Sequence, residues 1–421
     1  MAFSFSDFRK AGDPPTLLSA FLYFDVSFMV WVILGPLGPF IGEAYHLTAA
    51  QKGLLTAVPP LGGAFFRPIL GWMTERFGGR LTGLIGLGLT LVPLLIAWKF
   101  ASNFADFVGV GLLLGVSGAS FAAALPLASG WYPPEHQGLA MGIAGAGNSG
   151  TLLSTLFAPR LAQAFGWHTV FLVAMAPVLA VWIIFFFLAK DSPTPRRVKT
   201  WAEYAAIFKI ADTGWFCFLY SLTFGGFVGL ASYLSIFFHD QYHLAKVQSG
   251  DFTTIVVLFG SFLRPIGGVL SDRVGGYKML LGLLCGAGLC LAAVGTLPPV
   301  VFALGFLAIG MGMLGMGNGS VFQLVPQRFA GQVGIMTGIV GAAGGIGGFL
   351  LPSLLGYIKG AFGSFGIGFA VLALIVFFGA TCLWLLKGTW RKNWPAAAAI
   401  RAGLIPENVA AQPSGSYAAN V

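Results

Sequence analysis

Two arginines stand inside apolar stretches of this sequence, and each is followed directly by proline. Arg67 lies in GGAFFRPILGWMTERFGG (62–79), and Arg264 lies in FGSFLRPIGGVLSDRVGG (259–276). Arg67 has no acidic residue within seven positions on either side, so no partner one helical turn away neutralises it. Guanidinium is a planar cation with paired donors, which match a planar oxyanion. These residue types therefore predict the binding of a small anion.

The elements that position these arginines are predicted to be membrane helices. Of the 421 residues, 57% are hydrophobic and 9% are charged, whereas soluble domains carry about 25% charged residues. Apolar stretches of about 20 residues, long enough to cross a bilayer as a helix, recur along the chain. We place twelve of them at 17–41, 50–72, 81–100, 104–131, 137–160, 167–189, 212–238, 248–270, 279–298, 300–326, 332–358 and 364–387. Continuous runs such as VWIIFFFLA lack the alternation of a transmembrane β-barrel, so the fold class is an all-α membrane protein.

The basic residues orient these helices. The formal net charge is +9, and 23 residues are Lys or Arg. With Arg67 and Arg264 set aside, 16 fall on the side of the N-terminus and five on the other side. This bias predicts that both termini are cytoplasmic in a protein of the cytoplasmic membrane, with the lipid bilayer as its surroundings. The distribution explains the basicity without nucleic acid.

The chain repeats itself after 197 positions. This shift superimposes the two arginine stretches, Arg67 on Arg264, and six helices in each half are typical of a secondary transporter. We therefore expect two pseudo-symmetric six-helix halves, and in WAEYAAIF, within the linker, a short helix at the membrane interface. The divisions are an N-terminal cytoplasmic segment, a first bundle, a cytoplasmic linker, a second bundle and a flexible cytoplasmic tail, at 1–16, 17–189, 190–211, 212–388 and 389–421.

The turn after the second helix of each half carries a shared motif. GWMTERFGGR and GVLSDRVGGYK both fit G-x-x-x-[D/E]-R-x-G followed by a basic residue. The motif resembles the signature loop of the major facilitator superfamily, which implies that family's fold. Glu75 or Asp272 would then cap the next helix or pair with a neighbouring arginine, and the alternative is a simple polar turn. The residues matched to the loops are Gly71, Glu75, Arg76, Gly78 and Arg80 in the first half, and Gly268, Asp272, Arg273 and Gly275 in the second.

No cofactor, metal site or enzymatic activity is expected. GAGNSG (145–150) matches G-x-G-x-x-G, but it lies in a predicted span, and Val170 stands where a dinucleotide site needs an acidic residue. Small residues in membrane helices more often allow close packing, which is also our interpretation of the glycine-rich segments at 310–320 and 338–348. The four cysteines lie in apolar spans without a CxxC motif. Neither a nucleophile–base pair nor a phosphate loop is evident.

Several motifs together resemble the nitrate/nitrite porter family within that superfamily. They are the two Arg-Pro pairs, SGASFAAALP (117–126), GAGNSG (145–150) and LYSLTFGGF (219–227), and the match covers nearly all of 17–388. The resemblance implies that nitrate or nitrite is held between Arg67 and Arg264. It also implies a substrate-binding role for Phe121, Asn148, Tyr220 and Phe224. The second glycine-rich segment, GAAGGIGG, has no asparagine.

Each assignment has an alternative. An arginine near a helix end can snorkel to the interface, and Phe121, Phe224 or Tyr220 could be ordinary packing residues. An amide in a membrane span needs hydrogen-bond partners, and Asn318 could stabilise helix contacts rather than substrate. The substrate itself could be another small anion, such as formate or oxalate, and an anion sensor that does not transport is a further alternative.

The paired charges bear on mechanism. Two guanidinium groups about 10 Å apart repel by roughly 1.7 kcal/mol at an effective dielectric constant near 20. An anion between them relieves this repulsion, so the loaded carrier should reorient more readily than the empty one, which favours exchange. Asp25 is the one acidic residue well inside a span. It could carry a proton for symport, neutralise one arginine, or contact water near the cytoplasmic end. We expect a monomer.

Overall fold

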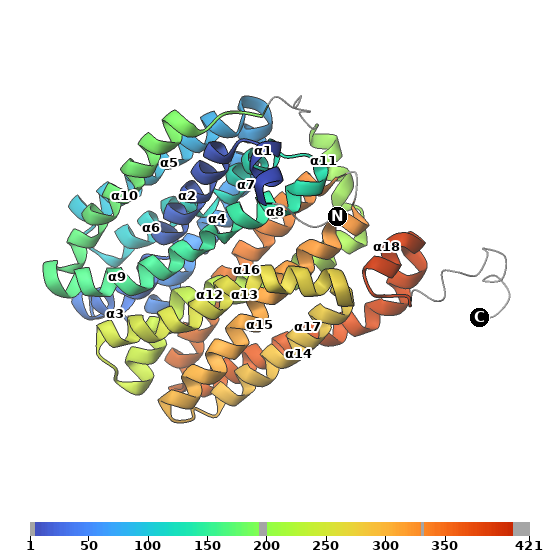
Figure 1. Ribbon diagram of the computed structural model, residues 1–421. Coiled ribbons are helices and arrows are strands. Elements are labelled where there is room, and N and C mark those ends of the chain that lie inside the picture. The colour runs from blue at the N-terminus through green and yellow to red at the C-terminus, as the bar shows by residue number, and fades with distance from the viewer. Residues whose placement is uncertain (1–4, 193–199, 330–331, 407–421) are drawn as a thin grey trace.

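The helices form two bundles that pack side by side. The structure is a computed structural model that describes residues 5–192, 200–329 and 332–406. Within these ranges every regular element is a helix. Helices α2 to α10 form one bundle and α12 to α17 form the other (Figure 1). This division agrees with the repeat that the sequence predicts.

The first bundle and its N-terminal segment contain α1 to α10, with one short 3-10 helix, η1. Their bounds are α1 Phe5–Ala11, α2 Pro14–Trp31, α3 Leu34–Ala44, α4 Ala49–Phe77, α5 Gly79–Lys99, α6 Phe104–Gly118, α7 Phe121–Ser129, α8 Pro134–Gly145, η1 Ala146–Ser149, α9 Gly150–Phe165 and α10 Trp167–Leu188.

The second bundle is preceded by the linker helix α11 and followed by the short helix α18. The bounds are α11 Trp201–Phe208, α12 Ala211–Tyr242, α13 Lys246–Val274, α14 Gly276–Gly295, α15 Val300–Arg328, α16 Val333–Phe362, α17 Phe365–Asn393 and α18 Ala396–Arg401. The helix predicted in WAEYAAIF is confirmed as α11. A capping box begins this helix: the Thr200 side chain accepts a hydrogen bond from the Glu203 N–H, and the Glu203 side chain accepts one from the Thr200 N–H. These two bonds satisfy N–H groups that have no partner within the helix.

Eleven helical segments of the described chain are long and apolar enough to cross a membrane. The expected fifth span (137–160) is present as α8, η1 and α9, and it is interrupted at Ala146–Ser149. Two other spans of the first half are also broken, between α2 and α3 and between α6 and α7. Their counterparts in the second half, α12 and α15, are continuous. The two halves therefore have the same order of helices, but the first half interrupts inner helices that are continuous in the second.

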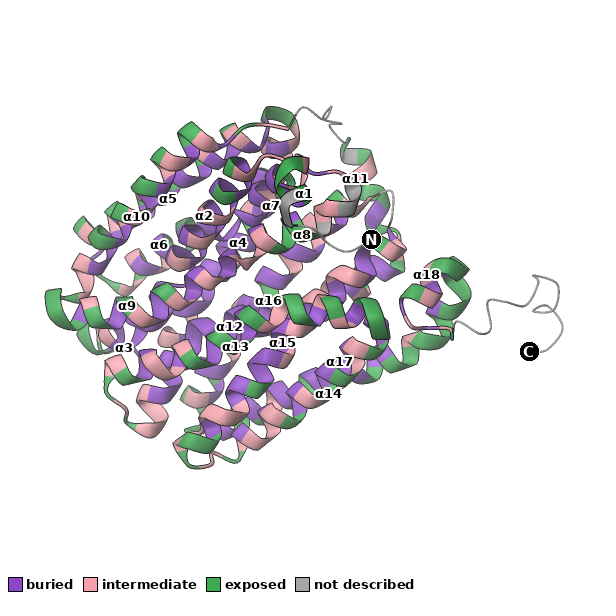
Figure 2. Ribbon diagram, viewed as in Figure 1, coloured by how far each residue is buried: buried purple, intermediate pink, exposed green. Residues whose placement is uncertain are grey.

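Burial separates inner from outer helices. Side chains along most of α12 are buried, whereas α5, α10, α14 and α17 leave large apolar residues exposed (Figure 2). Leu289 on α14 is 65% exposed and Leu374 on α17 is 67% exposed. An apolar surface of this extent suits lipid rather than water. The residues that must perform polar chemistry accordingly come from the inner helices.

The predicted flexible tail is wrong for residues 389–406. Helix α17 continues to Asn393, and α18 packs back onto the second bundle. The indoles of Trp390 and Trp394 donate to the two carboxylate oxygens of Asp212 at 2.9 and 3.3 Å, and Arg328 pairs with the same carboxylate. This segment is ordered because it buries two indoles that also find an acceptor. Residues 407–421 lie outside the described part of the chain.

The two signature turns have the same backbone geometry. Gly78 ends α4 with φ of 97°, and Gly275 ends α13 with φ of 93°, a conformation that favours glycine. The N-cap residues of α5 and α14 are these two glycines, which have no side chain to cap the helix. Glu75 and Asp272 lie in the last turns of α4 and α13, and capping of the next helix by either carboxylate stays a prediction.

Among the described residues, three ion pairs join the halves at the end of the bundle opposite α1 and α18. Lys52 lies 2.7 Å from Asp240, and Arg160 lies 2.6 Å from Asp251. Lys246 pairs with Glu43. All three connect α3, α4 or α9 to the start of α13 or the end of α12, so this end of the bundle is closed in the present conformation.

Candidate functional site

Arg67 is a buried cation that bridges the two halves. Its side chain is 2% exposed and projects from the middle of α4. The Nε group donates to the carbonyl oxygen of Gly118 at 3.1 Å, and Nη1 donates to the carbonyl oxygen of Gly341 on α16, in the other half. Its Cζ atom lies 5.3 Å from the ring of Trp31 and 5.1 Å from the ring of Phe224. Burial with four such contacts is the opposite of a side chain that snorkels to the interface.

Arg264 faces the same aromatic ring from α13. Its Cζ atom lies 6.0 Å from the ring centre of Phe224, so both guanidinium groups contact one phenylalanine. Unlike Arg67, Arg264 has a buried Nη1 for which no acceptor is present among the described residues. A buried donor without an acceptor is costly. The site thus holds a cationic donor that an anion could satisfy.

The predicted aromatic residues gather around these cations. Tyr220 and Phe224 lie one turn apart on α12 and stack with ring centres 5.1 Å apart and an interplanar angle of 3°. Phe322 of α15 meets Tyr220 edge-on at 5.1 Å and Phe121 at 6.0 Å. Phe121 belongs to the first half, so this cluster crosses the interface. All three predicted rings therefore lie in one contact network with Arg67 and Arg264.

Three aromatic residues of this network, Phe28, Trp31 and Phe322, are not among those predicted from the sequence. Trp31 is fully buried, donates to the carbonyl oxygen of Pro59 at 2.7 Å and stacks on Phe224 with ring centres 6.4 Å apart. Phe28 contacts both Trp31 and Phe224. Phe24, Phe28 and Trp31 recur at i, i+4 and i+7, the spacing of one helix face. This periodicity was the available signal, and it was hidden among the 40 phenylalanines and 11 tryptophans of the chain.

Glycines leave room for these side chains. A Cβ atom at Gly118 would overlap the Trp31 ring, so a larger residue cannot stand where the Gly118 carbonyl meets Arg67. A Cβ atom at Gly344 of α16 would lie 2.8 Å from both Tyr220 and Phe224. The glycine-rich segment 338–348 therefore forms a packing face, as predicted. It also sets the position of the stacked rings of Tyr220 and Phe224, which we call the aromatic floor of the site.

Two buried amides lie nearby without partners. The side chains of Asn148 on η1 and Asn318 on α15 are each 1% exposed, and neither amide has a hydrogen-bond partner among the described residues. Buried polar groups are normally paired. Helix η1 packs against α2 and α13, the helix of Arg264. Asn318 lies one turn before Phe322 on the same face of α15. Each half therefore contributes one unsatisfied amide from an element that packs against or carries residues of the site.

Asp25 occupies the junction between α2 and η1. Its Oδ1 accepts a hydrogen bond from the hydroxyl of Ser149 at 2.7 Å, and the residue is half-buried. Gly150 packs directly on the backbone at Asp25. The ion pairs of the described residues do not include one between Asp25 and Arg67 or Arg264. Asp25 is thus adjacent to the helix that carries Asn148, but its partner is a hydroxyl.

The signature-loop residues form a separate region at the end of the bundle that carries α1 and α18. Arg76 lies over the rings of Trp72 and Phe77, at 5.8 and 6.0 Å. The backbone N–H of Arg80 donates to Asp191 at 3.1 Å, and its Nη2 donates to the carbonyl oxygen of Phe186 at 2.8 Å. In the second half, the backbone N–H of Tyr277 donates to the carbonyl oxygen of Ala402. Arg80 and Tyr277 thus fasten neighbouring segments at this end of the bundle.

Comparison with known proteins gives a match at the level of the family. The family model described as Major Facilitator Superfamily matches residues 19–352. A nitrite extrusion protein of Bacillus subtilis is 34% identical over 352 residues, 82% of this chain and 88% of that protein. A probable nitrate/nitrite transporter of Mycobacterium tuberculosis, NarK2, is 35% identical over 79% of this chain and 85% of its own length.

A third relative and two solved structures extend the comparison. A probable nitrate transporter of Staphylococcus carnosus, NarT, is 32% identical over 86% of this chain and 93% of its length. The crystal structure of a D-xylose–proton symporter superposes with a TM-score of 0.71 at 16% identity, covering 88% of this chain and 97% of the other. A bacterial homologue of the lysosomal transporter Spinster gives a TM-score of 0.68 at 15% identity, with coverage of 91% and 100%. At these identities the structures are similar in fold alone.

Proposed function

Because the chain belongs to the nitrate/nitrite porter family of the major facilitator superfamily, we propose that it transports nitrate, nitrite or both. The anion binds between Arg67 and Arg264, and the two halves rock around it by alternating access. The relatives named above support the choice of substrate. The protein is a multi-pass membrane transporter, and we place its termini in the cytoplasm.

The buried Nη1 of Arg264 is the observation that carries this proposal. The guanidinium group of Arg264 contacts the same Phe224 ring as that of Arg67. Its Nη1 atom has no acceptor among the described residues. A small planar oxyanion supplies acceptors in the plane that a guanidinium fork requires. The amides of Asn148 and Asn318 add donors that also lack partners within the described chain. The rings of Tyr220 and Phe224 exclude water from the bound anion.

The same contacts suggest how the cycle proceeds. Arg67 holds Gly341 across the interface, and three ion pairs close the end opposite α1 and α18. We expect the anion to enter from the end that carries α1 and α18, because the ion pairs hold the halves together at the opposite end. Reorientation must break these cross-half contacts and bring the two cations into a closed site. A bound anion offsets the repulsion between the cations, so the loaded carrier moves more easily than the empty one.

Exchange of one anion for another is the mode that this site favours. The carrier then returns loaded with a second anion, because an empty site leaves the two guanidinium groups repelling each other. The carboxylate of Asp25 on α2 accepts a hydrogen bond from Ser149. Proton-coupled symport is the second mode, and it requires Asp25 to gain and lose a proton during each cycle.

Uptake into proteoliposomes tests both the substrate and the mode. Labelled nitrate uptake is measured into vesicles preloaded with nitrite and into empty vesicles under an inward proton gradient. We expect uptake only with internal nitrite. Uptake into empty vesicles that follows the proton gradient would replace exchange by symport. Stronger competition by external formate or oxalate than by nitrite would instead assign a different anion to the site.

A further inference from the structure

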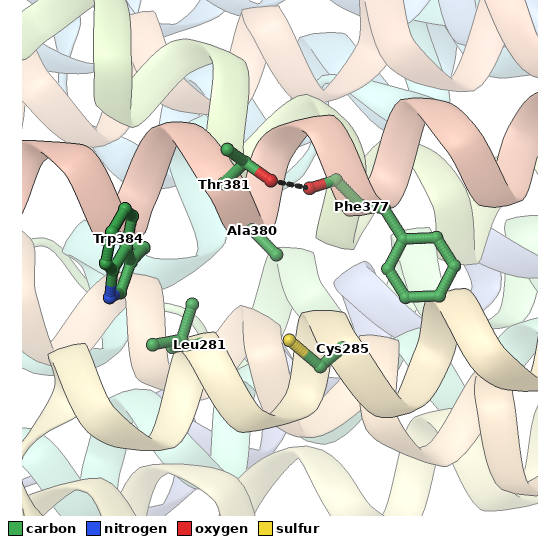
Figure 3. Close-up of a pocket in the computed structure, with 6 residues that line it drawn as sticks. All are labelled: Leu281, Cys285, Phe377, Ala380, Thr381 and Trp384. Carbon is green, nitrogen blue, oxygen red and sulfur yellow. Dashed lines mark hydrogen bonds between the residues drawn. The ribbon is translucent and has the colours of Figure 1, made fainter.

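A groove opens on the outer surface of the second half, between α14 and α17. Leu281 and Cys285 line it from α14, and Phe377, Ala380, Thr381 and Trp384 line it from α17 (Figure 3). Its volume is about 290 Å³, just below the roughly 300–1,000 Å³ of typical ligand pockets. The hydroxyl of Thr381 donates to the carbonyl oxygen of Phe377 at 2.9 Å, within its own helix. The groove therefore presents an apolar lining.

The groove faces the hydrocarbon of the bilayer. The side chain of Trp384 at its edge is 61% exposed, and the neighbouring Phe378 and Leu385 are 62% and 63% exposed. Such apolar exposure on an outer helix pair is compatible with contact to lipid chains. A narrow apolar groove on this surface fits a segment of an acyl chain and offers no partner to a polar ligand along its length.

Three cations stand where the groove reaches the end of the bundle that carries α18. Helices α14 and α17 run antiparallel: Gly288 packs on Phe377, and Gly295 packs on Ala370. The start of α14 therefore lies beside the end of α17. Lys278 precedes Leu281 by three residues, while Lys387 and Arg391 follow Trp384 by three and seven. Helical spacing places all three on the groove's face of their helices.

These cations are available to a ligand. Lys278, Lys387 and Arg391 are all exposed, and the ion pairs of the described chain do not include them. An apolar groove that ends in a group of free cations matches a molecule with an apolar chain and an anionic head. The spacing of cations from groove lining, about one to two helical turns, corresponds to the short distance between a lipid phosphate and its first methylenes.

The matching helix pair of the first half is closed. There Trp182 of α10 turns inward, donates to the carbonyl oxygen of Leu84 at 3.1 Å and stacks on Phe186 at 5.9 Å. The cation at that end, Arg80, already donates to the carbonyl oxygen of Phe186. The protein's own side chains thus occupy the position that stays open between α14 and α17. The contacts of Trp182 and Arg80 thus distinguish this helix pair from α14 and α17.

We propose that the groove between α14 and α17 binds one anionic phospholipid. An acyl chain lies along Leu281, Cys285 and Trp384, and the phosphate lies among Lys278, Lys387 and Arg391. The lipid comes from the leaflet on the side of the chain termini, where basic residues and anionic headgroups attract each other. The occupant is identified by charge complementarity: free phosphate would not use the groove, and a neutral lipid would not use the cations.

Native mass spectrometry of the full-length protein tests this site. The protein is exchanged into mixed micelles that contain equal amounts of phosphatidylglycerol and phosphatidylcholine with identical chains. We expect one phosphatidylglycerol to be retained, preferred about tenfold or more over phosphatidylcholine, because three cations act on its headgroup. The triple variant Lys278→Gln, Lys387→Gln, Arg391→Gln should lose this preference.

Two further variants control the result. Arg9→Gln, Lys10→Gln, Lys209→Gln removes three exposed cations at the same end of the molecule but outside the groove, and it should keep the preference. Cys285→Trp fills the groove from an exposed position and should lower retention of both lipids. The proposal is overturned if wild-type protein shows no preference, if the control triple loses it equally, or if Cys285→Trp changes nothing. If the groove triple does not fold, Lys278→Gln alone and Cys285→Trp decide between the same outcomes.

Discussion

Arg67 and Arg264 occupy matching places in the two halves, yet their surroundings differ. Arg67 is buried, donates to two carbonyl oxygens and joins α4 to α16 across the interface. Arg264 is half-buried, and its buried Nη1 has no acceptor in the described chain. The sequence repeat thus places the same residue at matching positions, but the hydrogen-bond partners of the two arginines differ. Arg67 joins the two halves through its carbonyl acceptors, whereas Arg264 keeps one buried donor, Nη1, that a bound anion would satisfy under the proposed function.

A similar asymmetry appears in the helices around them. The first half interrupts its inner spans at three places, and the 3-10 helix η1 brings Asn148 and Ser149 against α2. The second half uses continuous helices and a glycine-rich face on α16 to achieve close approach. The first half therefore uses helix breaks, and the second half uses glycines, to bring polar groups and aromatic rings close to the interface between the halves.

Conservative substitution of the arginines tests this comparison with the largest expected effect. Arg264→Lys and Arg67→Lys should each take nitrate uptake by proteoliposomes below detection, because each loses charged hydrogen bonds worth about 1.5–3 kcal/mol apiece. Only Arg67→Lys should also destabilise the protein, by about 1–3 kcal/mol, since it leaves carbonyl oxygens of Gly118 and Gly341 without their donor. Thermal unfolding in detergent measures the second effect.

Arg401→Lys, in the exposed last turn of α18, is the matched control for both arginine variants and should behave as wild type. Near-normal uptake by either Arg67→Lys or Arg264→Lys would remove the two-arginine site. Equal destabilisation by both would show that the two arginines are structurally equivalent, contrary to the contacts described above.

The glycine face of α16 gives a smaller effect. In Gly344→Ala the new Cβ atom would lie 2.8 Å from Tyr220 and Phe224, and such overpacking costs about 1–3 kcal/mol. We expect a raised KM for nitrate together with a lower unfolding temperature. Gly338→Ala on the same helix meets no neighbouring atom within 4 Å and should leave both quantities unchanged. A KM that moves equally in both variants would mean that the helix backbone, rather than the aromatic floor, is responsible.

Substitution of Asn148 in the first half and Asn318 in the second tests whether the two buried amides contribute equally to anion binding. Asn148→Leu and Asn318→Leu are nearly isosteric changes, and neither removes a protein hydrogen bond that the structure shows. If each amide binds the anion, each variant should raise the KM for nitrate about tenfold, the loss of roughly 1.4 kcal/mol, without lower stability. A variant that unfolds more easily while its KM stays at the wild-type value would assign that amide to helix packing.

Asp25→Asn should have the smallest effect on exchange. The amide can still accept the hydrogen bond from Ser149, but it cannot carry a proton. Nitrate–nitrite exchange should proceed at the wild-type rate, and any uptake driven by a proton gradient should disappear. The two activities are measured on the same vesicles with and without internal nitrite, and Ser149→Ala serves as the partner variant. Loss of exchange as well would make Asp25 part of the packing between α2 and η1.

Much of the architecture could be predicted because it follows from local rules. A stretch of about 20 apolar residues must form a helix in a bilayer, since each backbone group needs an internal partner. The repeat at 197 positions related the halves and selected Arg67 and Arg264. The tail from Trp390 to Ala402 could not be predicted, because its order depends on a distant carboxylate, Asp212, and on the surface of α14.

The residues of the site likewise fall into two groups: those that the sequence predicts and those that only tertiary contacts identify. Composition, span length and the Arg-Pro repeat determined a membrane fold with two cations in its interior, because charge in an apolar span is rare enough to be visible in the sequence itself. Tertiary structure alone decided that Trp31, Phe28 and Phe322 complete the site, and that Arg67 finds its acceptor on Gly341. The physical reason is that contacts across the interface join residues up to 274 positions apart, and no local periodicity records which face of one helix meets which face of another.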